Sequence, residues 1–243
     1  CGAPGGDCLR NDLMTDTKLV IAVIGGTGNQ GSGLAMRWAR AGHDIIIGSR
    51  DAGRAAQAAT DITAMAPVGS EWGNVRGADN FSAATECQIA VLAVPYSNQI
   101  DTITPIAGAL KGKLLIDVTA PLVPPKVGTV QLPEGGSAVV AVQKMLGEEV
   151  TVVAAFQNIA AQHLADLDHK IDCDVLVCSN KKSAREIVID LAKDAGMTGW
   201  HAGPLANAAA AEAMTSVLIS INRAHKIPGS GIRITGTPAE SKG

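Results

Sequence analysis

Short apolar runs alternate with amphipathic segments along most of the chain. The runs predict strands over residues 19–24, 44–47, 88–94, 113–118, 151–155, 175–178 and 197–201. The segments between them predict helices over residues 30–42, 51–65, 97–110, 135–147, 158–166, 181–195 and 204–225. The strand runs are continuously apolar, which is typical of strands covered by helices on both faces. The pattern therefore predicts an α/β fold with a doubly wound, mostly parallel sheet of the Rossmann type.

Two stretches interrupt this alternation. Residues 66–80 contain Pro67 and several glycines, which predicts a loop with room for a short strand. Residues 119–134 carry Pro121, Pro124, Pro125 and Pro133, which excludes a helix or a central strand there. This second stretch follows the carboxyl end of a strand. It is therefore either an ordinary covering loop or the border of a ligand site.

We place a domain boundary near Phe156. Residues 18–156 are expected to form the dinucleotide-binding domain, and residues 157–243 a smaller, helix-rich domain that ends in a loose Gly, Ser and Lys tail. The first dozen residues are rich in glycine and show no pattern, and Met14 resembles a natural start. Residues 1–17 are therefore expected to be disordered or an extension.

Composition narrows the class of protein. The chain has 243 residues, 47% of them hydrophobic and 18% charged, which excludes intrinsic disorder. A net charge of -3 and only six aromatic residues (three Trp, one Tyr, two Phe) argue against nucleic-acid binding. No apolar run approaches the ~20 residues of a membrane span, and no secretory signal is recognisable. Five cysteines without a C-x-x-C pair fit free thiols, so we expect a cytoplasmic protein.

A glycine-rich turn follows the first strand. Gly26, Gly28 and Gly31 satisfy G-x-G-x-x-G between a buried strand and a helix, and a second strand follows about twenty residues later. In this pattern the first glycine allows a tight turn, the second lets the backbone approach a pyrophosphate, and the third lets the helix pack on the strand. The N-terminal N–H groups of the helix then face the anion. The turn predicts a dinucleotide site.

The end of the second strand indicates which dinucleotide binds. NAD-binding proteins usually carry Asp or Glu at this point, whereas this chain has Ser49 and Arg50, followed one helical turn later by Arg54. A hydroxyl and two guanidinium groups suit the 2'-phosphate of NADP. Asp51 is expected to cap the next helix rather than to bind ribose. We therefore predict NADP(H) as the cofactor.

A proton-transferring partner is not evident. The Tyr-x-x-x-Lys pair of short-chain reductases is absent, because the single tyrosine is Tyr96 and no lysine follows it at that spacing. His163, Asp166, Asp168 and His169 resemble metal ligands, but no further ligand set accompanies them, so we interpret them as polar surface. Hydride transfer between two ring cofactors needs mainly stacking and alignment. We therefore expect neither a catalytic acid or base nor a metal.

Several motifs resemble the NADPH-dependent reductases of the deazaflavin coenzyme F-420 (F420). They are the run VIGGTGNQGSGLA at 23–35 with GSR at 48–50, IAVLAVP at 89–95, PLVP at 121–124, residues 167–175, AGPLAN at 202–207, and Gly231 with Ile232. The resemblance spans about residues 18–234 and both halves of the chain. It implies a Rossmann-type enzyme that transfers a hydride directly and reversibly between NADP(H) and F420.

The resemblance also implies where the ligands lie. Thr27, Gly28, Asn29 and Gln30 would line the pyrophosphate and 2'-phosphate, and Ser49, Arg50 and Arg54 would hold the 2'-phosphate. Val94, Tyr96 and Ile100 would lie along the ribose and nicotinamide, which Asn158, Ile159 and Ala161 would back. The deazaflavin would stack near Pro121, Leu122 and the helix start at Leu205 and Asn207.

One departure from the family concerns the segment behind the nicotinamide. Relatives carry His-Thr and a proline where this chain has Gln157, Asn158 and Ala160, which bears on the fine placement of the deazaflavin. The family also implies a homodimer, for which the small side chains of residues 207–214 leave room. Two alternative functions stay open: an NADPH-dependent reductase of another acceptor, such as a flavin or an imine, and a non-catalytic NADP(H)-sensing module.

Overall fold

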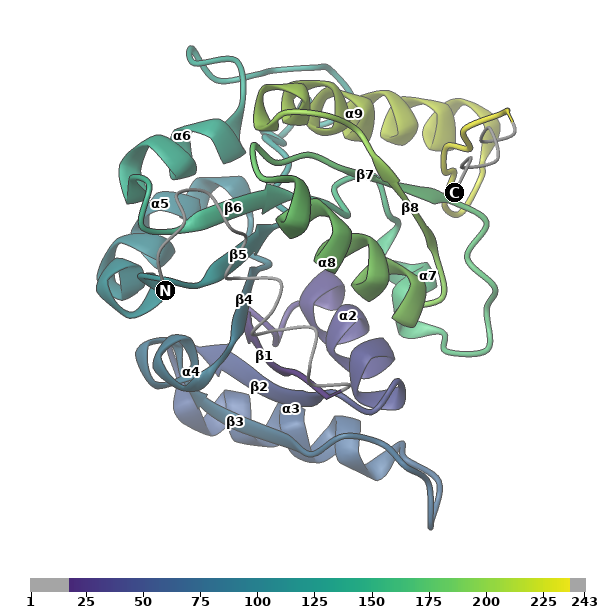
Figure 1. Cartoon of the computed structure of the whole chain (residues 1–243). Coiled ribbons are helices and arrows are strands. Elements are labelled where there is room, and N and C mark those ends of the chain that lie inside the picture. Colours follow the sequence, from purple (N-terminus) through teal and green to yellow (C-terminus); the bar gives the residue numbers. More distant parts are fainter. Residues whose placement is uncertain (1–17, 237–243) are drawn as a thin grey trace, which may run out of the picture.

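Six parallel strands form the central sheet (Figure 1). The computed structural model describes residues 18–236, so the expectation for residues 1–17 lies outside the described residues. The sheet order is β3-β2-β1-β4-β5-β6, with β3 and α9 at opposite ends of the molecule (Figure 1). The strands are β1 (Val20–Ile24), β2 (Asp44–Ser49), β3 (Val75–Asp79), β4 (Ile89–Leu92), β5 (Leu114–Asp117) and β6 (Thr151–Ala154). The predicted doubly wound fold is confirmed.

Helices connect these strands and cover both faces of the sheet. They are α2 (Asn29–Arg40), α3 (Ala52–Ala64), α4 (Asn80–Glu86), α5 (Gln99–Ile103), α6 (Ala138–Leu146), α7 (Ala161–Ala165), α8 (Lys182–Asp194) and α9 (Ala208–His225). Along β1, Ile21 and Val23 point into one hydrophobic cluster with α2, α3 and α8. Ala22 and Ile24 point into the other cluster, with α4, α5 and α6. Burial on both faces explains the continuously apolar strands.

A second, two-stranded parallel sheet consists of β7 (Asp174–Val177) and β8 (Thr198–His201), which α8 connects. It continues the central sheet, because Ala154 in β6 and Cys178 after β7 form an antiparallel bridge with N–O distances of 2.9 and 3.0 Å. The aromatic rings of Trp38 and Phe156 pack edge to face nearby, with centroids 5.8 Å apart. The C-terminal part of the chain is thereby joined to the edge and to one face of the central sheet.

Residues 66–80, predicted as a loop with room for a short strand, contain β3, and α4 begins at the last of these residues. The side chains of β3 are half-buried or exposed, so the sequence shows no apolar run that would predict this strand. Gly77 lies against α3, where a Cβ atom would come within 2.3 Å of the Ala55 carbonyl carbon. The strand is therefore held by backbone pairing and close helix contact rather than by apolar side chains.

Several predicted helix bounds also need correction. The helix expected over 97–110 is three pieces, a 3-10 turn η1 (Tyr96–Asn98), then α5, then a 3-10 turn η2 (Thr104–Leu110), since Pro105 cannot continue α5. The helix expected from 135 begins at Ala138, because Ser137 caps it by accepting from the Val140 N–H. The helix expected over 158–166 is only α7, and a 3-10 turn η3 (Leu205–Asn207) precedes α9.

Candidate active site

The glycine turn after β1 is shaped by close backbone contacts. Gly25 has a φ of +80°, a conformation that favours glycine. A Cβ atom on Gly31 would lie 2.8 Å from the Gly25 carbonyl oxygen, so only glycine lets α2 approach the strand this closely. Gly28 precedes α2, and neither a side-chain cap nor an acidic residue occupies the first turn of the helix. The N–H groups of that turn are therefore available to an anion.

A pocket of about 400 Å³ opens beside this turn. Six residues predicted from the sequence line it: Thr27, Gly28, Ser49, Arg50, Arg54 and Val94. Its other lining residues are Gly25, Asp51, Asn80, Ala93, Pro95, Asn98 and Thr102. The pocket thus spans the carboxyl ends of β1, β2 and β4, where open α/β sheets bind their ligands.

The β2 end of the pocket is rich in unpaired positive charge. Arg50 and Arg54 are exposed, and neither takes part in a salt bridge within residues 18–236. Asp51 caps α3, since its Oδ1 accepts from the Arg54 backbone N–H at 3.1 Å, which confirms the predicted cap. The Ser49 hydroxyl oxygen accepts from the Asp51 N–H at 3.2 Å. Two guanidinium groups and a hydroxyl therefore line the same end of the pocket, a combination that suits an anion.

Asn80 is a pocket residue that sequence reasoning missed. Its Oδ1 atom is buried and has no hydrogen-bond partner. Asp79 fixes the turn before it by accepting from the Phe81 and Ser82 N–H groups, each at 2.9 Å. The sequence signal was an Asp that caps a helix, which the interpretation of residues 66–80 as a loop obscured.

The other predicted contacts lie outside this pocket. Tyr96 in η1 is half-buried, and Ile100 in α5 is 44% exposed. Pro121 is buried, Leu122 is half-buried, and Ala161 begins α7. Ile159 is only 4% exposed and belongs to the main core, and Leu205 is buried as well. The Asn207 amide donates to the Ala202 carbonyl at 2.7 Å.

Two side chains of the predicted set form long-range hydrogen bonds. Asn29 begins α2, and the next side chain, Gln30, donates from Nε2 to the Phe156 carbonyl at 2.8 Å. Asn158 donates from Nδ2 to the Asp174 carbonyl at 2.8 Å, and its Oδ1 is buried without a partner. The structure therefore uses Gln30 and Asn158 to hold residues 156–158 between α2 and β7.

Asp117, at the end of β5, is a buried carboxylic acid that the sequence reasoning did not single out. Burial raises its pKa to about 6. Three groups oppose this rise. The Thr119 N–H and the Gln99 amide donate to the carboxylate, and the Thr119 hydroxyl faces it without a well-aligned hydrogen bond. The negative charge of Glu212 in α9 adds to it.

Replacing Asp117 by asparagine is expected to stabilise the protein at neutral pH. The pKa of about 6, against the ordinary 3.8, means that the folded chain binds this proton more tightly than the unfolded chain. The stabilisation that comes from binding this proton is on the order of 3 kcal/mol. It is fully present below about pH 4 and is lost as the pH rises through about 6. Urea unfolding of both proteins between about pH 4 and 8 measures the difference.

Glu212 contributes to the pH curves of both proteins, so their difference reports Asp117 together with its coupling to Glu212. Burial raises the pKa of Glu212 too, but this residue is present in both proteins. Its carboxylate accepts from the Ser137 hydroxyl and from the Ala138 and Val139 N–H groups at the start of α6. Parallel pH curves for the two proteins would show that Asp117 does not titrate in this range.

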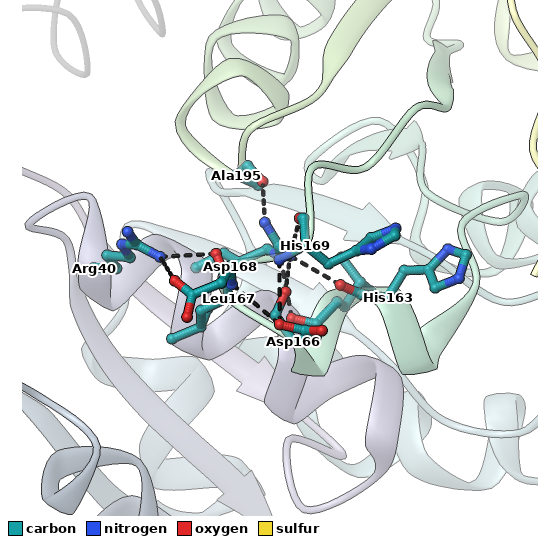
Figure 2. Close-up of polar contacts among 9 residues, drawn as sticks. Arg40, His163, Asp166, Leu167, Asp168, His169 and Ala195 are labelled. Carbon is teal, nitrogen blue, oxygen red and sulfur yellow. Dashed lines mark hydrogen bonds and ion pairs between the residues drawn. The ribbon is translucent and has the colours of Figure 1, made fainter.

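A buried arginine in α2, Arg37, joins this helix to α7, to the segment after α7 and to the turn after α8. Figure 2 shows His163, Asp166, His169 and Ala195 gathered at this point. Arg37 is 7% exposed and donates to the carbonyl groups of His163, Leu164, Asp166, His169 and Ala195. Burial lowers its pKa, the charge of Arg40 lowers it further, and Asp166 opposes both. The rings of His163 and His169 stack with centroids 4.4 Å apart. Among residues 18–236, no three His, Cys, Asp or Glu side chains gather as metal ligands.

The cysteines of the described chain are buried thiols. Cys87, Cys173 and Cys178 are free, and burial raises the pKa of each, that of Cys178 to about 11. The prediction of free thiols is confirmed for these three cysteines. None of the helices in the described part of the chain is long and apolar enough to cross a membrane.

The sheet order and the pocket beside the glycine turn define a dinucleotide-binding protein of the Rossmann class. Residues 20–121 match the family described as NADP oxidoreductase coenzyme F420-dependent. The chain is 40% identical over 223 residues to the F420-dependent NADP reductase of Methanothermobacter marburgensis, and this alignment covers 90% of this chain and 99% of the relative. It is 39% identical over 219 residues to that of Methanocaldococcus jannaschii, covering 88% and 97%. The chain belongs to the family of F420-dependent NADP reductases.

Solved structures agree with this assignment. A protein of Arthrobacter sp. FB24, proposed to be an F420-dependent NADP reductase, superposes with a TM-score of 0.73 at 26% identity and covers 90% of this chain and 100% of its own. A pyrroline-5-carboxylate reductase of Coxiella burnetii has a TM-score of 0.54 at 14% identity, covering 76% and 59%, and shares the fold alone. The resemblance seen in the sequence motifs is confirmed.

Proposed function

We propose that the protein is an oxidoreductase that transfers a hydride directly and reversibly between NADP(H) and coenzyme F420. The observation that carries this proposal is the pocket beside the glycine turn, where two unpaired arginines flank the end of β2. The family to which the chain belongs is named for the same two redox partners. NADPH supplies the hydride when bound, and the protein contributes binding and alignment of the two rings.

The proposed binding roles follow the position of each segment along the strand ends. The first turn of α2, with Thr27, Gly28 and Asn29, would bind the pyrophosphate, and Ser49, Arg50 and Arg54 the 2'-phosphate. Val94, Tyr96 and Ile100 would follow the ribose and nicotinamide, with residues 158–161 behind the ring. The deazaflavin would lie by Pro121, Leu122 and the start of α9 near Leu205 and Asn207. Gln30 would act through its bond to the Phe156 carbonyl.

We further propose that residues 18–156 form the NADP-binding domain and that residues 157–243 complete the deazaflavin site. Free thiols fit a reducing compartment, which supports the cytoplasm. A homodimer would cover the apolar side chains that α9 and the following segment expose. These are Val217, Ile221, Ile227 and Ile234, each 37–43% exposed.

Mixing the protein with NADPH and oxidised F420 tests the function. We expect the deazaflavin absorbance to fall as NADPH is consumed, and the reverse reaction to run with reduced F420 and NADP+. A flavin and a cyclic imine, offered as acceptors in the same assay, separate this activity from the two alternatives. Turnover with those acceptors alone, or NADPH binding without turnover, would contradict the proposal.

A further inference from the structure

Asp117 links three segments of the chain at the edge of the sheet where ligands are expected. Its carboxylate accepts from the Gln99 Nε2 at 2.7 Å and from the Thr119 N–H at 2.9 Å. Its backbone carbonyl accepts from the Gln157 Nε2 at 2.8 Å. All four residues are at most 3% exposed, so water does not compete for these bonds.

Each of these partners belongs to a segment that the proposed function places around the two rings. Gln99 begins α5, directly after the turn η1 that contains Tyr96, and Ile100 follows it. Thr119 precedes Pro121 and Leu122, and Gln157 precedes residues 158–161. The network extends to α9 as well, because the Thr215 hydroxyl donates to the Gln157 carbonyl at 2.9 Å. One buried residue therefore contacts three of the segments proposed to surround the site, two through its carboxylate and one through its backbone carbonyl.

Burying a charged side chain at this position costs free energy of desolvation. Asp117 ends a strand whose other side chains, Leu114, Leu115 and Ile116, are fully buried and apolar. An apolar residue of similar size would avoid the desolvation of a carboxylate. A carboxylate, however, accepts two directional hydrogen bonds at once, which fixes α5 relative to the turn at Thr119. Direct hydride transfer depends on such placement, since a shift of about 1 Å can slow a reaction about 10²-fold.

We propose that Asp117 is a positioning residue for the hydride transfer. Its carboxylate holds the segments that begin at Gln99 and Thr119 in one arrangement around the nicotinamide and the deazaflavin, beside the Gln157 segment that its backbone carbonyl binds. It does not line the pocket beside the glycine turn, so its effect falls on the alignment of the rings rather than on dinucleotide affinity. The inference rests on the function proposed above.

Two variants with opposite expectations test this role. Asp117→Val removes both side-chain acceptors but suits a buried strand, whereas Asp117→Asn keeps an acceptor for Thr119 and can pair with Gln99 after that amide rotates. In single turnovers with NADPH and F420, we expect Asp117→Val to lower the hydride-transfer rate at least about tenfold, and Asp117→Asn to retain most of it. The NADPH dissociation constant should change less than about threefold in both.

A wild-type rate in a folded Asp117→Val protein would overturn the proposal. So would an NADPH affinity that falls in proportion to the rate, because the residue would then act on binding or on the fold. Gln99→Leu removes the same bond from the opposite side and is expected to slow transfer in the same direction. It carries the test if Asp117→Val does not fold.

Failure of the proposed function can be told apart from failure of this inference. If the wild-type protein binds NADPH but does not reduce F420, the function is wrong. The surroundings of the ring are then compared through the nicotinamide fluorescence of the saturated complexes. Emission that changes in Asp117→Val and is restored in Asp117→Asn would still support the positioning role, and identical emission in all three proteins would overturn it.

Discussion

Replacing Arg37 by methionine is expected to lower the free energy of unfolding by about 3–5 kcal/mol. Methionine fills much of the same space, but the five carbonyl groups that now accept from the guanidinium lose their donor (Figure 2). These groups belong to residues 163–169 and to Ala195, far along the chain from α2. The loss should therefore loosen the contact between α2 and the C-terminal part of the protein.

Arg40→Met is the matched control on the same helix. Arg40 is half exposed, donates to the Leu167 carbonyl at 2.8 Å and lies 3.9 Å from the exposed Asp168 carboxylate. An exposed pair of this kind contributes about 0–1 kcal/mol, so this variant should unfold close to the wild-type protein. Urea unfolding followed by far-UV circular dichroism measures both. Equal losses for Arg37 and Arg40 would mean that the buried carbonyls find other donors or water.

The sequence predicts those parts of the fold that depend on local patterns. Continuous apolar runs identified β1, β4, β5 and β6, because strands covered on both faces need apolar side chains at every position. The glycine turn and the run of Ser49, Arg50 and Arg54 are also local, and the structure places these residues around one pocket. The bounds of β3 within residues 66–80 could not be predicted, because Val75–Asp79 is held by backbone pairing and carries no buried side chain.

Contacts between distant residues could not be predicted in this way. Gln30 pairs with the Phe156 carbonyl, 126 positions away, and Arg37 with the Leu164 carbonyl, 127 positions away. Neither residue type nor spacing indicates these partners, since both depend on how α2 lies against the C-terminal part of the chain. Asp117 was overlooked for the same reason. A single acid at a strand end shows its role only when Gln99, Thr119 and Gln157 are seen around it.

Removing both pocket arginines is expected to abolish the preference for NADPH. A charge-assisted hydrogen bond contributes about 1.5–3 kcal/mol, so Arg50→Ala should lower kcat/KM for NADPH about ten- to a hundredfold. The double variant, which also carries Arg54→Ala, should lower it about 10³-fold, with some shortfall where both groups contact one phosphate. NADH lacks the 2'-phosphate, so its kcat/KM should change little. The ratio of the two values, measured with the same acceptor, reports the effect.

Arg76→Ala is the control for a general loss of positive charge at this end of the sheet. Arg76 lies in β3, outside the pocket, and its guanidinium pairs with Glu86 at 2.5 Å. Its removal should leave the nucleotide ratio unchanged, because it cannot reach the phosphate that Arg50 and Arg54 flank.

Rising salt should weaken NADPH use in the wild-type protein and hardly affect the double variant. Equal losses with NADPH and NADH in the double variant would show that the two arginines support the fold or the ribose and do not recognise the 2'-phosphate.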